Sequence, residues 1–278
     1  MQRKTAEFMI AVLDELGYMA YNVGGNDLAF GLEWVQSLAN KAQVPFLSAN
    51  ILDSDGDLAF RPYIEEKVGR RKFGIVGICS VPNYELTGGS VGDPIEALKK
   101  YVIEIRDKVD FIIVLAAVSD AEETQILQTG LPVDLILRAA TYRFSHSIIT
   151  ENDMMVSRLG NIGKYLGRIQ ITIHDPRQPI ADASKLRSQL EYVGKRLSSF
   201  SKHIGNQSLE EYYKDRPNIV NIVRSLQEHQ VKLEKELREI VNPVDFELIA
   251  LDKNIADDPE MRRLIDEHKE KYNIQAPQ

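Results

Sequence analysis

The hydrophobic pattern of residues 1–175 alternates between helical and strand periods. Apolar positions from Phe8 to Leu16 approximate one face of a helix, and Gly17 is a suitable residue to end it. Two continuous apolar runs, residues 73–79 and 111–118, have the length of strands that are buried on both faces. These segments predict a sheet whose strands are separated by helices.

Shorter segments between these landmarks complete the expected order of elements. Strand and helix alternating in this way predict an α/β domain over residues 1–175. The remaining expected elements are a strand over 19–23, a helix over 28–39, an extended segment over 45–51, an acidic turn over 53–57, a helix over 93–109 that Asp93 caps and Pro94 opens, a strand over 133–137, and two extended segments between 148 and 173.

The pattern changes near Asp175, after which the sequence predicts an almost entirely helical chain. Apolar residues recur every three or four positions from Leu186 to Leu197 and again from Val223 to Ile240. Two such seams favour a pair of antiparallel helices with coiled-coil-like contacts. We therefore expect a second region over residues 176–278, consisting of a helical hairpin and a C-terminal helix region.

Composition and charge argue against several classes of function. The chain has 278 residues, with 34 Lys and Arg against 41 Asp and Glu, so its net charge of -7 argues against binding nucleic acid through bulk charge. The single cysteine, Cys79, excludes an intramolecular disulfide and a multi-cysteine zinc site. No apolar run approaches about 18 residues, so we expect no membrane span. The N-terminal residues lack the pattern of a secretory signal peptide.

An ordered set of short motifs runs through residues 16–167. In chain order these motifs are Leu16-Gly-Tyr18, Gly24-Gly-Asn-Asp-Leu-Ala-Phe-Gly31, Leu47-Ser-Ala-Asn-Ile51, Pro62-Tyr63, Gly74-Ile-Val-Gly-Ile78, Ile112-Ile-Val-Leu-Ala-Ala117, Val133-Asp-Leu-Ile136, Ala139-Ala-Thr-Tyr142 and Gly160-Asn-Ile-Gly-Lys-Tyr-Leu-Gly167. The set resembles the calcineurin-like metallophosphoesterases, and among them the 5'-nucleotidase branch. The resemblance implies an α/β/β/α sandwich of two sheets. For an active member it also implies phosphoester hydrolysis with two divalent metal ions, such as Mn²⁺ or Zn²⁺.

The positions that match the family's metal ligands carry unsuitable side chains. In an ungapped alignment the family's Asn and His fall on Gly25 and Asn26, whereas a one-residue deletion moves them to Asn26 and Asp27. The His of the family's Leu-Ser-His motif falls on Ala117. The paired His of its Gly-His-x-His motif fall on Ala140 and Tyr142.

Few metal donors therefore survive in the matched motifs. Asn26 and Asp27 supply oxygen atoms, and His146 is a candidate for a displaced ligand. This set is too small to hold two divalent ions. We expect no cofactor and assign no catalytic residue.

The family's first two ligand-bearing strands would precede Met1. Without them we expect an unpaired sheet edge beside residues 111–118. Three alternatives follow: the sheet closes the gap, a partner chain or a second copy covers it, or the sequence is part of a longer protein. The third alternative would also remove a signal peptide, which secreted or periplasmic members of this branch often carry, so the localisation stays open.

Three hypotheses for function remain. The first is a non-catalytic derivative of the fold that acts by binding or assembly. The second is a metal-dependent phosphoester hydrolase that uses Asn26, Asp27 and His146 together with ligands supplied upstream. The third is a scaffold or oligomerisation protein led by the helices after residue 176. Elsewhere, we expect Cys79 to be a core residue, and the acidic turn 53–57 lacks the spacing of a calcium-binding loop.

Overall fold

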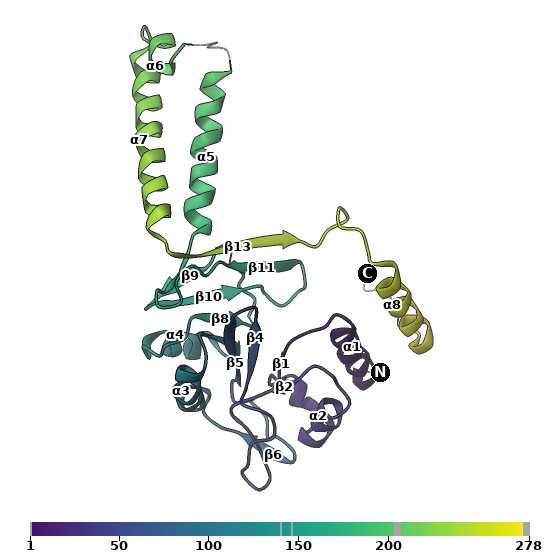
Figure 1. Cartoon of the computed structure of the whole chain (residues 1–278). Coiled ribbons are helices and arrows are strands. Elements are labelled where there is room, and N and C mark those ends of the chain that lie inside the picture. The colour runs from purple at the N-terminus through teal and green to yellow at the C-terminus, as the bar shows by residue number, and fades with distance from the viewer. Residues whose placement is uncertain (1, 140, 146, 203–206, 275–278) are drawn as a thin grey trace. The chain divides into compact units, whose positions relative to one another are not determined.

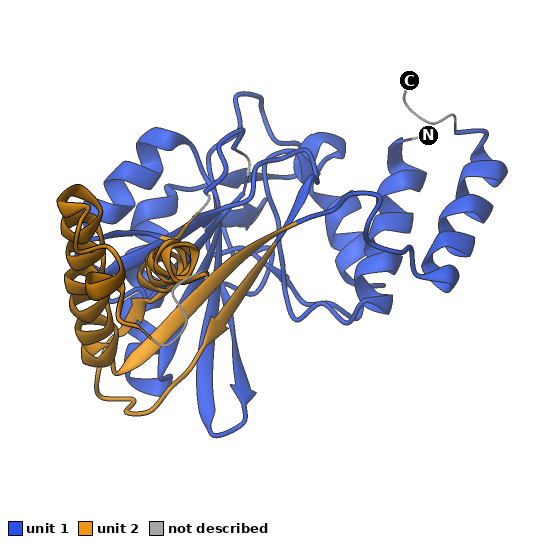
Figure 2. Ribbon diagram, turned by 90° about the horizontal axis from the view of Figure 1, so that it is seen from above, with its two compact units in different colours: residues 1–145, 149–166, 250–278 blue, residues 146–148, 167–249 orange. Residues whose placement is uncertain are grey.

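The structure is a computed structural model that describes residues 2–139, 141–145, 147–202 and 207–274 (Figure 1). The chain forms two compact units (Figure 2). Unit 1 comprises residues 1–145, 149–166 and 250–278, and unit 2 comprises residues 146–148 and 167–249. The units therefore divide differently from the boundary expected at residue 175, because the C-terminal residues belong with the first unit.

Unit 1 contains most of the strands. Its elements are α1 (Gln2–Glu15), β1 (Tyr21–Asn22), the 3-10 turn η1 (Asp27–Phe30), α2 (Leu32–Ala39), β2 (Phe46–Leu47), β3 (Ile51–Asp53), β4 (Tyr63–Val68), β5 (Arg71–Cys79), β6 (Gly89–Val91), α3 (Pro94–Ile105), the 3-10 turn η2 (Arg106–Lys108), β7 (Phe111–Ala117), α4 (Asp120–Gln128), β8 (Leu135–Arg138), β9 (Ile149–Glu151), β10 (Met154–Arg158) and α8 (Pro259–Tyr272). The helix expected over 28–39 is interrupted at Gly31, whose φ of 87° separates η1 from α2.

A six-stranded sheet organises this unit, in the order β4-β5-β7-β8-β10-β9. Strands β5, β7, β8 and β10 are parallel neighbours, and β4 and β9 pair antiparallel at the two edges. The expectation of an unpaired edge beside residues 111–118 is wrong for β7. That strand pairs with β5 from Phe111 to Ala117 and with β8 from Ile113 to Ala116. Its continuous apolar sequence therefore reflects a central strand.

Helices α3 and α4 cover one face of this sheet (Figure 1). The N-cap Asp93 accepts hydrogen bonds from the backbone of Ile95 and Glu96, and Pro94 occupies the first turn, as predicted. Leu98, Val102 and Ile105 recur at helical spacing. They are fully buried against apolar side chains of the strands. The capping residues and the buried apolar residues of α3 therefore both agree with the helix that the sequence predicted.

The other face of β5 meets β2 at very close range. A Cβ atom added to Gly77 would lie 2.5 Å from Asn22 Oδ1 and 2.9 Å from Leu47 Cβ. Real side chains do not approach so closely, so the absence of a side chain at Gly77 is what allows β2 to lie against the sheet.

Gly77→Ala should therefore destabilise the protein by about 1–3 kcal/mol, because the added methyl group overpacks a rigid contact. Urea denaturation followed by circular dichroism would measure the change. Gly194→Ala is the matched control, since a Cβ there meets nothing within 4 Å and alanine is a better helix former. Equal stability of Gly77→Ala and the wild-type protein would contradict the packing described.

Unit 2 combines a small sheet with a helical hairpin. The three-stranded sheet has the order β11-β13-β12, and β11 (Tyr165–Ile171) begins in unit 1. The other elements are β12 (Ile180–Asp182), α5 (Ser184–Ser201), α6 (Leu209–Tyr212), α7 (Pro217–Glu239) and β13 (Asn242–Ala250). The prediction of an almost entirely helical chain after Asp175 is therefore wrong for β12 and β13.

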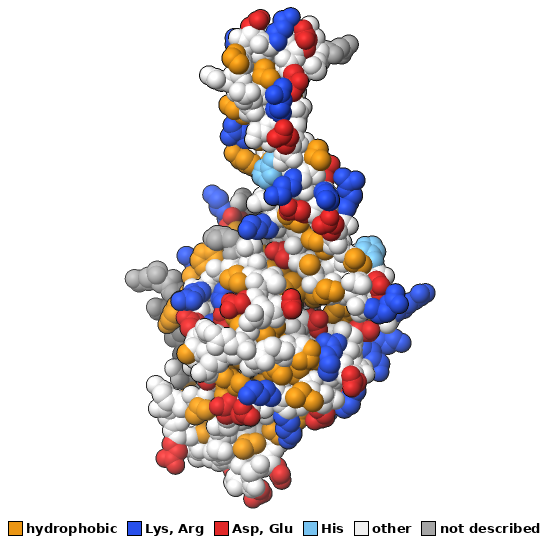
Figure 3. Space-filling view, turned by 90° about the vertical axis from the view of Figure 1, so that its left-hand side faces the viewer, with side chains coloured by type: hydrophobic (Ala, Val, Ile, Leu, Met, Phe, Trp, Pro, Cys, Tyr) orange, Lys and Arg blue, Asp and Glu red, His pale blue; other side chains and the backbone are white. Residues whose placement is uncertain are grey.

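Helices α5 and α7 form the antiparallel pair that the sequence predicted (Figure 1). Their seam buries Val193, Val223 and Leu233. Basic and acidic side chains are interspersed on the face of this hairpin that Figure 3 shows. Along α7, Lys232 pairs with Glu236 one turn away. Across the described part of the chain, no helix is long and apolar enough to cross a membrane.

Candidate functional site

Two of the matched ligand positions, Asp27 and Ala117, lie near each other where strands of unit 1 end. The loop from Gly24 to Asp27 follows β1, and Ala117 is the last residue of β7. A Cβ atom on Gly24 would lie 3.4 Å from Ala117 Cβ and 3.6 Å from Asp27 Oδ2. The Tyr84 hydroxyl donates to the carbonyl oxygen of Gly25 and holds the loop from a third segment. The structure thus places Asp27 and Ala117 on either side of Gly24, next to Gly25.

Asp27 uses its carboxylate oxygens to close its own loop. Oδ1 accepts a hydrogen bond from the Tyr21 hydroxyl at 2.8 Å, and Oδ2 accepts one from the Gly24 backbone at 2.7 Å. Burial raises the pKa of Asp27 and outweighs these two hydrogen bonds, which lower it. Among the described residues, none of the ion pairs involves Asp27. This carboxylate is therefore partly buried and has no ion-pair partner in the described part of the chain.

Two neighbouring side chains, Cys79 and Tyr21, have raised pKa values, which disfavour their charged forms. Cys79 is fully buried, as predicted for a core residue. Burial, followed by the negative charges of Asp27 and Glu122, raises the pKa of its thiol to about 12, so the reactive thiolate is suppressed. Burial also raises the pKa of Tyr21, with a further increase from the nearby Asp27 carboxylate.

The other candidate positions contribute little to this neighbourhood. Asn26 is exposed, and Tyr142 is 88% exposed on its loop. Ala140 and His146 lie outside the described residues. Among the residues that are described, no group of three or more His, Cys, Asp or Glu side chains could hold a metal ion. The donors present here do not fit a pair of divalent ions, which requires ligands from several strand ends.

A buried ion-pair network lies beside this neighbourhood, and sequence reasoning missed it. Arg138 ends β8 and its side chain is only 2% exposed. It contacts Glu123 at 2.7 Å and Asp120 at 2.9 Å, and its Nε donates to the Val118 carbonyl at 2.9 Å. Arg158 of β10 also binds Glu123. The arginine charges at the ends of β8 and β10 are therefore paired with carboxylates of α4.

The sequence did contain one signal for part of this arrangement. Ser119 and Glu122 have the spacing of a capping box, and the structure contains that box at the start of α4. The Glu122 carboxylate also accepts a hydrogen bond from the Ser80 hydroxyl. The capping box could have located the start of α4 after β7. The partners of Arg138 could not be read from it, because they come from segments distant in sequence.

Comparisons with known proteins relate the sequence and the fold to other chains. No family model matches the chain. The chain is 20% identical over 192 residues to the uncharacterized metallophosphoesterase YunD of Bacillus subtilis (strain 168), covering 66% of this chain and 42% of that protein. Its structure is similar to the calcineurin-like phosphoesterase YfkN of Bacillus subtilis, with a TM-score of 0.60, 14% identity, and coverage of 97% of this chain and 76% of that one.

The chain has the fold of the calcineurin-like metallophosphoesterases. A crystal structure of a 5'-nucleotidase precursor from Thermus thermophilus extends the likeness, with a TM-score of 0.56 and 20% identity. That match covers 63% of this chain and 39% of the Thermus chain. The motif-based resemblance is thus confirmed for the fold. The chain spans less than half the length of both the YunD and the Thermus proteins, so the activities of those whole proteins remain matters for proposal.

The raised pKa of Asp27 predicts how the stability of the folded protein depends on pH. The folded state binds this proton more tightly than the unfolded state, so stability falls as pH rises from the ordinary value of 3.8 through the raised one. Asp27→Asn removes this titration, and the variant should gain stability relative to the wild-type protein across that window. Urea denaturation at a series of acidic pH values would measure the difference. A difference that does not change with pH would show that Asp27 does not carry the shift.

Proposed function

We propose that this chain is a non-catalytic binding protein built on the metallophosphoesterase fold. The supporting observation is the placement of Ala117 beside the Gly24 to Asp27 loop at the strand ends, where a Cβ added to Gly24 would lie 3.4 Å from Ala117 Cβ. There, the methyl group of Ala117 stands at the position of the family's His. Both carboxylate oxygens of the neighbouring Asp27 already accept hydrogen bonds, from Tyr21 and from the Gly24 backbone. Hydrolysis by two metal ions needs several oxygen and nitrogen donors converging on one point. Asn26 and Asp27 supply too few.

A second candidate is a metal-dependent phosphoester hydrolase related to the 5'-nucleotidases. The observation that favours it is the Asp27 carboxylate, which is partly buried without a cationic partner among the described residues and has a raised pKa. A bound cation would compensate that charge and lower the pKa. In this case the missing ligands would come from outside the described residues, where His146 lies, or from another polypeptide.

Assays of phosphoester hydrolysis separate the two candidates. The purified full chain would be supplied with Mn²⁺ or Zn²⁺ and tested on AMP and on p-nitrophenyl phosphate, with and without a chelator. We expect no turnover above the background without protein. Turnover that the chelator abolishes, and that Asp27→Ala removes, would support the hydrolase instead. Asp107→Ala is the matched control, because Asp107 is an exposed carboxylate on η2, away from this site.

A further inference from the structure

The small parallel sheet of β1 and β2 in unit 1 leaves one edge of β1 unpaired. The backbone N–H groups of Tyr21 and Val23 donate to carbonyl oxygens on the β2 side, each at 3.0 Å. Along a strand, the backbone groups of successive residues point to opposite edges. The N–H and C=O of Asn22 therefore point away from β2, and no described residue forms a hydrogen bond with them. Such groups can pair with another strand.

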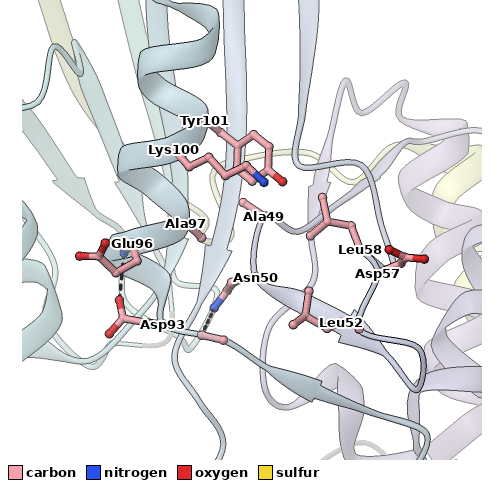
Figure 4. Close-up of a pocket in the computed structure, with 12 residues that line it drawn as sticks. Ala49, Asn50, Leu52, Asp57, Leu58, Asp93, Glu96, Ala97, Lys100 and Tyr101 are labelled. Carbon is pink, nitrogen blue, oxygen red and sulfur yellow. Dashed lines mark hydrogen bonds between the residues drawn. The ribbon is translucent and has the colours of Figure 1, made fainter.

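The chain that leaves β2, by contrast, is tied to other segments of unit 1. The N–H of Ser48 donates to the Arg61 carbonyl at 2.9 Å. The Asn50 side chain donates to the Gly92 carbonyl at 2.8 Å, and Figure 4 shows this bond beside a cavity of about 590 Å³. The edge that is open to a further strand is therefore the one on β1.

The six-stranded sheet is covered unequally beside this edge. Strand β2 lies against β5, and β1 lies against β5 and β7, so the next strand position in the small sheet lies over β7 and β8. On the face toward α3 and α4, Val114 and Ile136 are 0% exposed. On the opposite face, Leu115 and its register partner Leu137 are only half-buried. Central parallel strands are normally buried on both faces, so an apolar surface stays uncovered beyond β1.

The chain that enters β1 adds exposed apolar side chains. Leu16, Tyr18 and Met19 are 56%, 50% and 48% exposed. Exposed apolar groups beside an unpaired strand are typical of a surface that another chain covers. A segment that pairs with β1 would gain backbone hydrogen bonds and apolar contacts together.

We propose that the β1 edge accepts an extended segment of another polypeptide as an added strand. The backbone of the segment pairs with the N–H and C=O of Asn22, and its apolar side chains pack on Leu115 and Leu137. Side chains alternate between the two faces of a strand, so the segment needs an apolar residue at every second position. This inference rests on the binding role proposed above, for which it names the class of partner.

A second copy of this chain fits the edge less well than a single strand does. Suppose that the β1 strands of two copies paired antiparallel about a two-fold axis. The large sheet of the second copy would then overlap β8 and β10 of the first, because β8 and β10 continue the sheet beneath the open position. A single extended segment carries no sheet of its own and avoids this overlap.

Fluorescence anisotropy on the full chain tests the proposal with a labelled peptide in which valine and threonine alternate between terminal lysines. A control peptide has the same composition but consecutive valines, and it should bind at least about tenfold more weakly. Two further peptides carry N-methyl groups, one on its valines and the other on its threonines. Only one edge of the added strand faces β1, so one of these peptides should lose binding about tenfold and the other should retain it.

A substitution beneath the added strand tests where the peptide binds. Leu137→Ser removes apolar surface there and should weaken binding of the alternating peptide about tenfold. Ile103→Ser is the matched control, because Ile103 is 68% exposed on α3, which covers the other face of the sheet. This control should leave binding unchanged. Circular dichroism confirms that both variants are folded.

Four results would overturn the proposal. They are no binding of the alternating peptide up to about 1 mM, equal binding of the peptide with consecutive valines, the same effect of both N-methylation patterns, or binding that Leu137→Ser leaves unchanged. A dimer in light scattering that Leu137→Ser dissociates would assign the edge to a second copy instead. No phosphoester is present in these measurements, so their failure leaves the question of hydrolysis untouched.

Discussion

Glu123→Gln should lower the free energy of unfolding of unit 1 by about 3 kcal/mol, because it leaves buried arginine charge without its main partner. Glu123 binds both Arg138 and Arg158, and the Arg138 side chain is only 2% exposed. Asp120 still contacts Arg138, which limits the loss. Trp34 is the only tryptophan of the chain and lies in α2 of unit 1, so urea denaturation followed by its fluorescence reports on this unit.

The same network predicts how the loss depends on pH. Burial raises the pKa of Glu123, but the ion pairs with Arg158 and Arg138 prevail and hold it below its ordinary value of 4.5. A lowered pKa contributes stability above the unfolded value, and this contribution disappears as pH falls through the folded value. The difference between the wild-type protein and Glu123→Gln should therefore shrink in acid.

Asp120→Asn provides the matched control for this network. Asp120 contacts the same arginine at 2.9 Å, but its side chain is 52% exposed. Water screens such a pair, so its removal should cost much less than the removal of Glu123. Equal losses for the two variants would contradict the account of a buried network centred on Glu123.

Asn242→Ala should destabilise unit 2 by about 3 kcal/mol, because several buried hydrogen bonds disappear together. Asn242 is fully buried at the start of β13. Its oxygen accepts from the backbone of His174 and Asp175, and its amide donates to the carbonyls of Asp175 and Gln178. The side chain therefore fastens β13 to the turn that precedes β12.

Far-UV circular dichroism during thermal unfolding would measure the effect of Asn242→Ala, because α5 and α7 give unit 2 a strong helical signal. Asn254→Ala is the control, since Asn254 is exposed outside the regular elements. A midpoint in Asn242→Ala that matches the wild-type value would show that these hydrogen bonds do not hold β13 in place.

The sequence predicted the elements whose signals are local. The apolar runs of β5 and β7 indicated buried strands, and Asp93 with Pro94 marked the start of α3. The strand β13 was missed although Val244, Phe246 and Leu248 alternate along it. Its pairing partners, β11 and β12, lie about 60 residues or more earlier in the chain, and such distant contacts decide strand formation.

The candidate site, too, could be predicted from the sequence only in part. The motifs identified Asp27 and Ala117 as matched ligand positions, and the structure places both beside Gly24. The partners of Arg138, Glu123 and Asp120, had no such guide.

The content of bound metal tests the central claim most directly. The full chain would be purified with Mn²⁺ or Zn²⁺ supplied, and its metal per chain measured by elemental mass spectrometry. The account predicts a value near zero, because Asn26 and Asp27 are the only donors that the matched motifs retain. About two metal ions per chain, the number that family-type hydrolysis requires, would contradict it.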